Sequence, residues 1–77
     1  MNNIREDFRK IRKFYDIPTR KAADDSGLST GTISDFERGY DPKKEKTRKK
    51  IESYYRKLKI RFDNDIAKRA KEESAAV

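Results

Sequence analysis

Residues 18–39 read PTRKAADDSGLSTGTISDFERG, and this stretch decides the fold. Pro18 suits the opening of a helix, because its fixed φ is helical and its missing N–H is not needed in a first turn. Gly27 suits the left-handed conformation that ends many helices, and the Ser29 hydroxyl can cap the next one. The stretch therefore predicts two short helices joined by the turn Gly27-Leu28-Ser29, the second one spanning residues 30–38 and ending at Gly39.

A longer helix is predicted on each side of this pair. Residues 3–15 carry apolar side chains at spacings of four, three and four, namely Ile4, Phe8, Ile11 and Tyr15. This spacing places them on one face of a helix. After Pro42 the chain has no Gly or Pro as far as Val77 and is rich in good helix formers. With no strand pattern in the sequence, the expected class is all-α: a compact four- to five-helix bundle with a helix-turn-helix and a C-terminal helical extension.

The predicted core draws on all of these helices. Its centre is expected to be Leu28, Ile33 and Phe36, packed against Ile11, Phe14, Ile51 and Leu58. Five apolar residues of the last helix lie within about 80° on a helical wheel: Ile51, Tyr55, Leu58, Phe62 and Ile66. Ile60 points about 180° away from Ile51. That position predicts either a helix break near Lys59 or a helix contacted on two sides.

Composition limits the class of function. The chain has 77 residues, of which 45% are charged and 32% hydrophobic, so it can build one small core. It has no Cys and no His, which removes thiolate chemistry, the commonest metal ligand and the usual general base. The acids Asp24, Asp25 and Asp35 lack an accompanying base or nucleophile, so we expect no enzyme activity, no cofactor and no metal.

The absence of a long apolar run bears on location. No stretch approaches the ~20 apolar residues of a membrane span, and charged residues interrupt the N-terminus where a signal peptide would be apolar. We therefore expect a cytoplasmic, nucleoid-associated protein without a membrane partner. A chain of this size also leaves no room for a separate small-molecule ligand domain.

Positive charge is concentrated in one part of the chain. The formal net charge is +7, yet residues 1–39 contain 8 basic and 7 acidic side chains. Residues 43–61 alone contain 10 basic and 2 acidic side chains, an excess of +8. A strong basic excess makes an anionic polymer the default partner, with nucleic acid first and an acidic protein second. A basic run of this kind can also be only a solvated helix face.

Residues 18–39 resemble the lambda-repressor-like helix-turn-helix family, also called the Cro or XRE type. The resemblance rests on Ala23, the Gly27-Leu28-Ser29 turn, Thr32-Ile33-Ser34 and the closing Glu37-Arg38-Gly39, in the family's order and spacing. It implies a sequence-specific transcriptional regulator, usually a homodimer on a palindromic operator, whose second short helix enters the major groove of double-stranded DNA. We expect such a regulator, a repressor of bacterial, phage or mobile-element type.

The resemblance also assigns residue roles. It implies base contacts by Thr30, Gly31 and Asp35, and phosphate contacts by Thr19 and Thr32. The hydroxyl of Ser34 is added to the base contacts, because hydroxyl groups can bond to base edges. Arg12 and Glu37 match the family's internal ion pair, which positions the reading helix rather than touching DNA.

Non-specific affinity must come from elsewhere, because the reading helix carries no Lys and one terminal Arg. Phosphate neutralisation supplies most salt-dependent binding. The expected phosphate contacts beyond the two threonines are Arg20, Lys21, Arg38, Lys43, Lys44, Lys46 and Lys50.

A separate prediction concerns the C-terminal residues of the chain. The DNA-binding domain is predicted over residues 1–60, and residues 61–77 are predicted to be a helical extension that packs against a second copy or frays. The competing functional hypothesis is a protein-interaction module, such as an antitoxin or adaptor that binds an acidic partner. Salt-dependent preference for a palindromic duplex over a scrambled one would separate the two.

Overall fold

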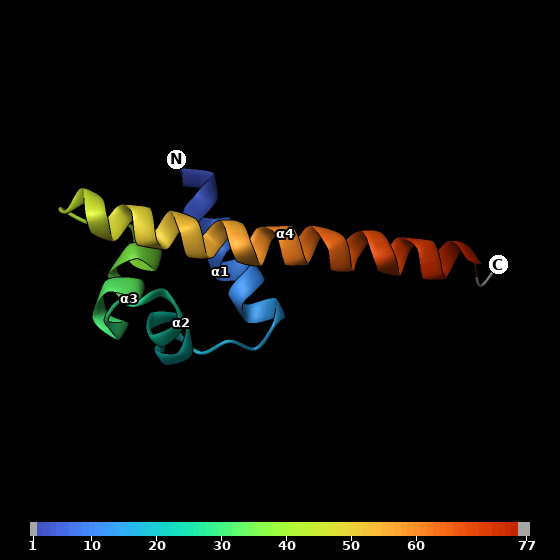
Figure 1. Ribbon diagram of the computed structural model, residues 1–77, viewed down its shortest axis with the longest axis horizontal. Helices are drawn as coiled ribbons and strands as arrows, with labels where there is room; N and C mark the ends of the chain where they lie inside the picture. The colour runs from blue at the N-terminus through green and yellow to red at the C-terminus, as the bar shows by residue number, and fades with distance from the viewer. Residues whose placement is uncertain (1, 76–77) are drawn as a thin grey trace.

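The computed structural model describes residues 2–75, which form four helices and no strand. They are α1 (Asn2–Phe14), α2 (Thr19–Ser26), α3 (Thr30–Arg38) and α4 (Glu45–Ala75). The first three gather along the N-terminal half of α4, whose C-terminal part projects past them (Figure 1). The predicted all-α bundle is confirmed, and its four helices fall within the expected four to five.

The turn chemistry places the two short helices where the sequence predicts them. Gly27 follows α2 with φ +74°, and Gly39 follows α3 with φ +114°, both left-handed conformations that an L side chain rarely adopts. The Ser29 hydroxyl accepts a hydrogen bond from the amide of Thr32 at 3.1 Å and so caps α3. These local contacts fix α3 at residues 30–38, the predicted bounds.

The core lies where α1 crosses between α3 and α4. Phe8 is fully buried, and its ring meets Phe36 edge-on at 5.8 Å and Tyr54 at 6.0 Å between centroids. The remaining buried apolar side chains are Ile11, Ile17, Ala22, Ala23, Ile33, Ile51 and Leu58. Leu28 is partly buried against this cluster.

Two predicted core contacts are wrong. Phe14 is 38% exposed, because α1 crosses α4 and its C-terminal end reaches beyond the central core. Its ring meets Phe62 edge-on at 5.0 Å instead. Ile66 is 43% exposed, since it points about 100° away from its neighbour Asp65, which contacts the end of α1. Tyr54, absent from the predicted stripe, is buried on the side of α4 that faces α2, and burial raises the pKa of its phenol.

Both alternatives predicted from the position of Ile60, a helix break and a helix contacted on two sides, are wrong. Helix α4 runs unbroken from Glu45 to Ala75, so there is no break near Lys59. The Ile60 side chain is 64% exposed, so the helix is not contacted on that side. Good helix formers without Gly or Pro carry α4 through this point, and the α4 side chains of the core, such as Ile51 and Leu58, lie on the opposite side of the helix.

The predicted extension is tied to the end of α1. The Tyr15 hydroxyl donates to Asp65 Oδ2 at 2.5 Å, and the Arg61 guanidinium lies 4.4 Å from the Tyr15 ring centroid. One turn further on, Arg69 lies 5.2 Å from the Phe14 ring. α4 is therefore supported by α1 well beyond residue 60. Ala76 and Val77 lie outside the described residues, and none of the helices within 2–75 is long and apolar enough to cross a membrane.

Candidate nucleic-acid interface

The outward side of α3 is open to solvent. Ile33 and Phe36 are buried, which turns the opposite side of this helix outward. That side, here called the reader face, comprises Thr30, Gly31, Ser34, Asp35 and Arg38. Ser34 is half-buried and the other four are exposed. A Cβ at Gly31 would meet only the Ser29 hydroxyl, at 3.9 Å, so nothing else in the described chain limits a close approach to the α3 backbone there.

A buried ion pair holds the C-terminal end of α3 against α1. Arg12 Nη2 lies 2.8 Å from Glu37 Oε1, and the two side chains are only 12% and 8% exposed. The same guanidinium donates to the carbonyl oxygen of Ile17 at 2.8 Å, which adds the loop between α1 and α2 to the contact. The pair uses one carboxylate oxygen, since Glu37 Oε2 is buried without a hydrogen bond. Arg12 thus fixes how α3 is presented without reaching the reader face.

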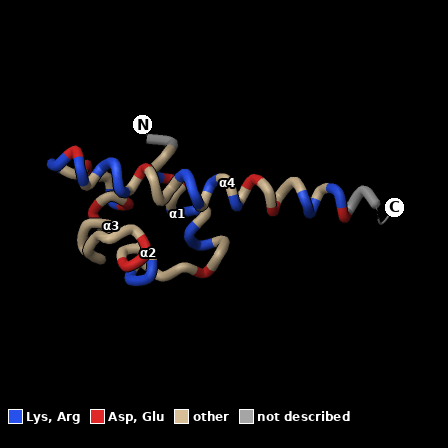
Figure 2. Tube along the Cα trace, viewed as in Figure 1, with Lys and Arg blue, Asp and Glu red and all other residues tan. Residues whose placement is uncertain are grey.

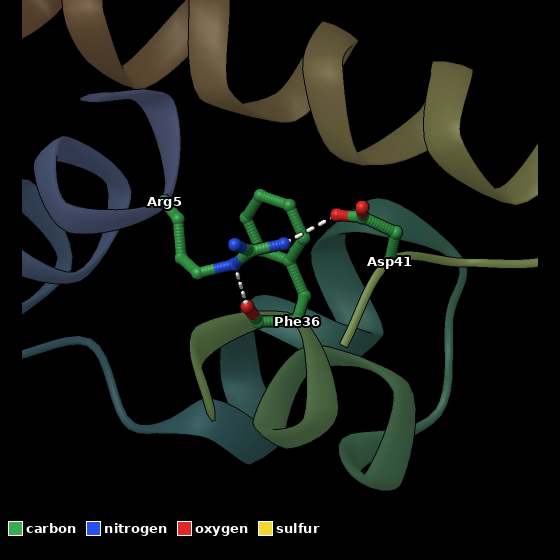
Figure 3. A network of polar contacts seen from close by, with 3 residues as sticks. All are labelled: Arg5, Phe36 and Asp41. Atoms are coloured by element: carbon green, nitrogen blue, oxygen red, sulfur yellow. Dashed lines mark hydrogen bonds and ion pairs between the residues drawn. The ribbon is translucent and has the colours of Figure 1, made fainter. Parts of the chain in front are cut away.

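A second arginine of α1, which sequence reasoning missed, holds the end of α3 (Figure 3). Arg5 Nε donates to the carbonyl oxygen of Phe36 at 2.5 Å, and the guanidinium lies 5.1 Å from the Phe36 ring centroid. Its Nη2 pairs with the carboxylate of Asp41 in the following loop. The Phe36 carbonyl, which also accepts the Gly39 amide at 3.2 Å, thereby has two donors at the end of α3. No sequence signal marks Arg5, because its partners lie more than thirty positions away.

Two hollows flank the reader face. The first, here the loop hollow, lies between α3 and the start of α4 and is lined by Thr32, Asp35, Tyr40, Asp41, Pro42, Lys43, Lys44 and Thr47. The second, here the helix hollow, lies between α3 and the first two helices and is lined by Arg9, Arg12, Thr19, Ser34, Glu37 and Arg38. Each hollow therefore borders a different edge of the reader face and holds at least one exposed cation.

The predicted phosphate-contacting residues divide between these hollows and other places. Lys43 and Lys44 line the loop hollow with Thr32, and Thr19 and Arg38 line the helix hollow. Arg9 joins the helix hollow although the sequence gave no reason to select it among the basic residues of α1.

The other predicted phosphate contacts are placed differently. Lys50 Nζ lies 4.0 Å from the position of a Cβ on Gly27, so this side chain reaches the turn between α2 and α3. Lys46 points about 140° away from the buried Ile51 on α4, at 100° per residue, and lines neither hollow. Arg20 is exposed on α2, and Lys21 forms an exposed ion pair with Asp25 at 3.4 Å.

The reader face carries less positive charge than the neighbouring surface of α4. Lys and Arg residues are concentrated along α4, whereas α3 carries acidic and neutral residues until Arg38 (Figure 2). A reader face with little charge of its own is suited to hydrogen bonds rather than to general attraction of an anion. Attraction must then come from the cations of the two hollows and of α4.

A polar contact between α1 and α4 keeps this arrangement rigid. The Tyr55 hydroxyl donates to Asp7 Oδ2 at 2.6 Å, and Lys59 Nζ lies 3.2 Å from the same oxygen. These two donors hold the pKa of the Asp7 carboxyl below its usual value, with the Tyr55 hydrogen bond as the largest cause. Together with the Tyr15–Asp65 bond, this contact fixes α4 to both halves of α1.

Searches of protein-family models, curated proteins and solved structures return no match to this chain. Within residues 2–75 no cluster of three carboxylate side chains is placed to hold a metal ion. The site is therefore interpreted from its own geometry.

Proposed function

We propose that this protein is a sequence-specific DNA-binding regulator of the lambda-repressor-like helix-turn-helix type, acting as a repressor. The observation that carries the proposal is the exposed reader face of α3, held by two arginines of α1 and flanked on both edges by hollows that contain cations. An exposed helix with cations on both sides suits the major groove of DNA, where phosphates lie on both sides of a bound helix. The sequence resemblance of residues 18–39 supports the same conclusion.

The dimensions of the duplex suit a single helix. The major groove is about 12 Å wide, and a helix with its side chains is about 10–12 Å across, so one helix fills the groove. A helix in that position has a row of phosphates on each side. Lys43 and Lys44 would meet one row, and Arg9, Thr19 and Arg38 the other.

The residues of the reader face can distinguish bases. The Asp35 carboxylate can accept a hydrogen bond from cytosine N4, and the hydroxyls of Thr30 and Ser34 can bond to either donors or acceptors. Gly31 allows the backbone to approach the base edges closely, because no side chain intervenes. Sequence preference is therefore assigned to these four residues and general affinity to the flanking cations.

The start of α2 supplies a further phosphate contact. Pro18 precedes α2 in an extended conformation and makes no capping side-chain bond. The first backbone amides of α2, beginning at Thr19, therefore stay available to an anion. A phosphate bound there would also meet the cations of the helix hollow.

A palindromic operator is part of the proposal. Two reader faces related by a two-fold axis would read half-sites about 34 Å apart, one turn of the duplex. Contacts with α1 already support α4 as far as Arg69, but Ile66 is still 43% exposed on the projecting part. We assign the contact between copies to the Ile66 side of this part of α4.

Selection of bound sites from random duplexes tests the function. A palindromic consensus with half-sites one helical turn apart is expected. The double variant Lys43→Glu, Lys44→Glu should weaken binding to all sequences alike and lower the dependence on salt. The proposal would be rejected in favour of a protein-interaction module if selection enriched no sequence and the double variant bound duplexes with the same affinity and salt dependence as the wild type.

A further inference from the structure

A second basic surface lies on the side of α4 that faces away from the other helices. It is called the outer strip here and consists of Ser53, Arg56, Lys57, Ile60, Asn64, Ala67, Lys68 and Lys71. At 100° per residue these positions fall within about 120° of one another and roughly opposite the buried Ile51 and Leu58. All eight are exposed, and the strip is about 27 Å long at 1.5 Å per residue.

The outer strip has four cations and no acid. Of the neighbouring acids of α4, Asp63 pairs with Lys59 at 3.6 Å and Asp65 accepts the Tyr15 hydroxyl, whereas Glu52 and Glu72 border the strip near its two ends. None of the four cations forms an ion pair with another described side chain. The positive charge of the strip therefore lies in two groups, Arg56 with Lys57 and Lys68 with Lys71, and is not taken up by ion pairs.

The chemistry of the strip favours a phosphate polymer over other anionic partners. Ile60 is its single large apolar residue, and a protein interface needs a cluster of apolar or aromatic anchors. A membrane-bound helix needs a broad apolar face, which the strip also lacks. Lysine, arginine, serine and asparagine are side chains that contact phosphate and sugar in DNA complexes without reading sequence.

The outer strip cannot share a duplex with the reader face. Helix α3 lies beneath the N-terminal end of α4 (Figure 1), whereas the strip lies on the side of α4 opposite the buried Ile51 and Leu58. The body of α4, about 10–12 Å across with its side chains, separates the two surfaces.

We propose that the outer strip binds the backbone of a second DNA duplex without sequence preference, so that one protein molecule holds two segments of DNA. The first duplex is the one assigned to the reader face, so this inference rests on the proposed DNA binding, although not on sequence reading by α3. Four phosphate contacts would give this second binding step a log–log salt slope of about −4, at about 0.9 per contact.

Nuclear magnetic resonance of the full chain can locate the second duplex. Titration with a short random-sequence duplex to two molar equivalents should first shift amides of α3 and then those of residues 53–71. Shifts that stay outside residues 53–71 at the second equivalent would overturn the proposal. Strip shifts with polyglutamate or anionic vesicles, but not with the duplex at the same salt, would also overturn it and identify an acidic protein or a lipid surface.

A matched pair of variants measures the contribution of the strip. Lys57→Gln with Lys68→Gln removes two charges from the strip, and Lys10→Gln with Lys13→Gln removes two exposed charges from α1. Capture of a labelled duplex by protein on an immobilised duplex is the readout. The strip variant should lower the salt slope of capture by about 2, and the control should leave it unchanged.

Equal slopes for both variants would reject the outer strip. Random-duplex selection separates this failure from that of the proposed function: loss of a consensus with retained strip binding rejects only the reading role of α3.

Discussion

Replacing Glu37 by alanine should destabilise the fold by removing a buried charge that is not part of the reader face. In the native protein the Glu37 carboxylate lies 2.8 Å from Arg12, and both side chains are nearly buried. Glu37→Ala removes the carboxylate and leaves the guanidinium buried, with the Ile17 carbonyl as its remaining partner. Breaking a buried pair by removing one member costs about 3–5 kcal/mol, because the charge left behind has lost both water and its partner.

The expected value lies at the lower end of that range. Only one carboxylate oxygen is used, and the other is already buried without a hydrogen bond, so the native pair is not fully satisfied. A loss of about 3 kcal/mol corresponds to a fall in Tm of about 12–24 °C for a chain of this length. That loss is a large share of the total stability of a small domain.

Thermal unfolding followed by circular dichroism measures this effect. Glu45→Ala is the matched control, since Glu45 forms an exposed pair with Lys49 at 3.7 Å and should change stability by less than about 1 kcal/mol. The double variant Arg12→Met, Glu37→Leu should be more stable than Glu37→Ala, because it leaves no buried charge. A Tm within about 3 °C of wild type for Glu37→Ala would refute the reasoning.

Three further predictions address binding, turn geometry and pH. Arg9→Gln should weaken binding to all duplexes and lower the salt slope by about 1 without changing Tm; an effect confined to one sequence would contradict the phosphate role. Gly27→Ala should cost about 1–2 kcal/mol in urea unfolding, since φ is +74° and no atom lies closer than 4.0 Å to the new Cβ, and an unchanged midpoint would show that the turn relaxes. Tyr55 and Lys59 lower the pKa of Asp7, so the ionised carboxylate stabilises the fold above pH about 4, and this contribution is lost as the pH falls through the lowered pKa. The difference in unfolding free energy between wild type and Asp7→Asn should therefore shrink over that acidic range. A difference that does not change with pH would contradict this.

Features that depend on local chemistry could be predicted from the sequence. The bounds of α3 follow from Ser29 at its start and Gly39 at its end, and a left-handed glycine at position 27 was expected from the turn pattern. Ile33 and Phe36 are buried as their spacing indicates. Such features involve neighbours within a few residues, so the sequence states them directly.

Features that depend on how helices cross could not be predicted. Phe14 lies on the apolar side of α1, yet the crossing point carries it past the core and onto Phe62. Arg5 and Arg9 look alike in sequence, but the fold brings one to the end of α3 and the other to the helix hollow. Ile60 is exposed because α1, α2 and α3 all pack on one side of α4, a choice that no local pattern reveals.

The most direct test of the central claim is the ratio of dissociation constants for a selected duplex and its scrambled counterpart, measured by fluorescence anisotropy at 150 mM salt. A reader face that recognises bases predicts a ratio of about 10³ or more. Asp35→Ala should lower the free energy of discrimination at one base position by about 1–3 kcal/mol. A ratio near one for the wild-type protein would contradict the assignment of α3 as a sequence-reading helix.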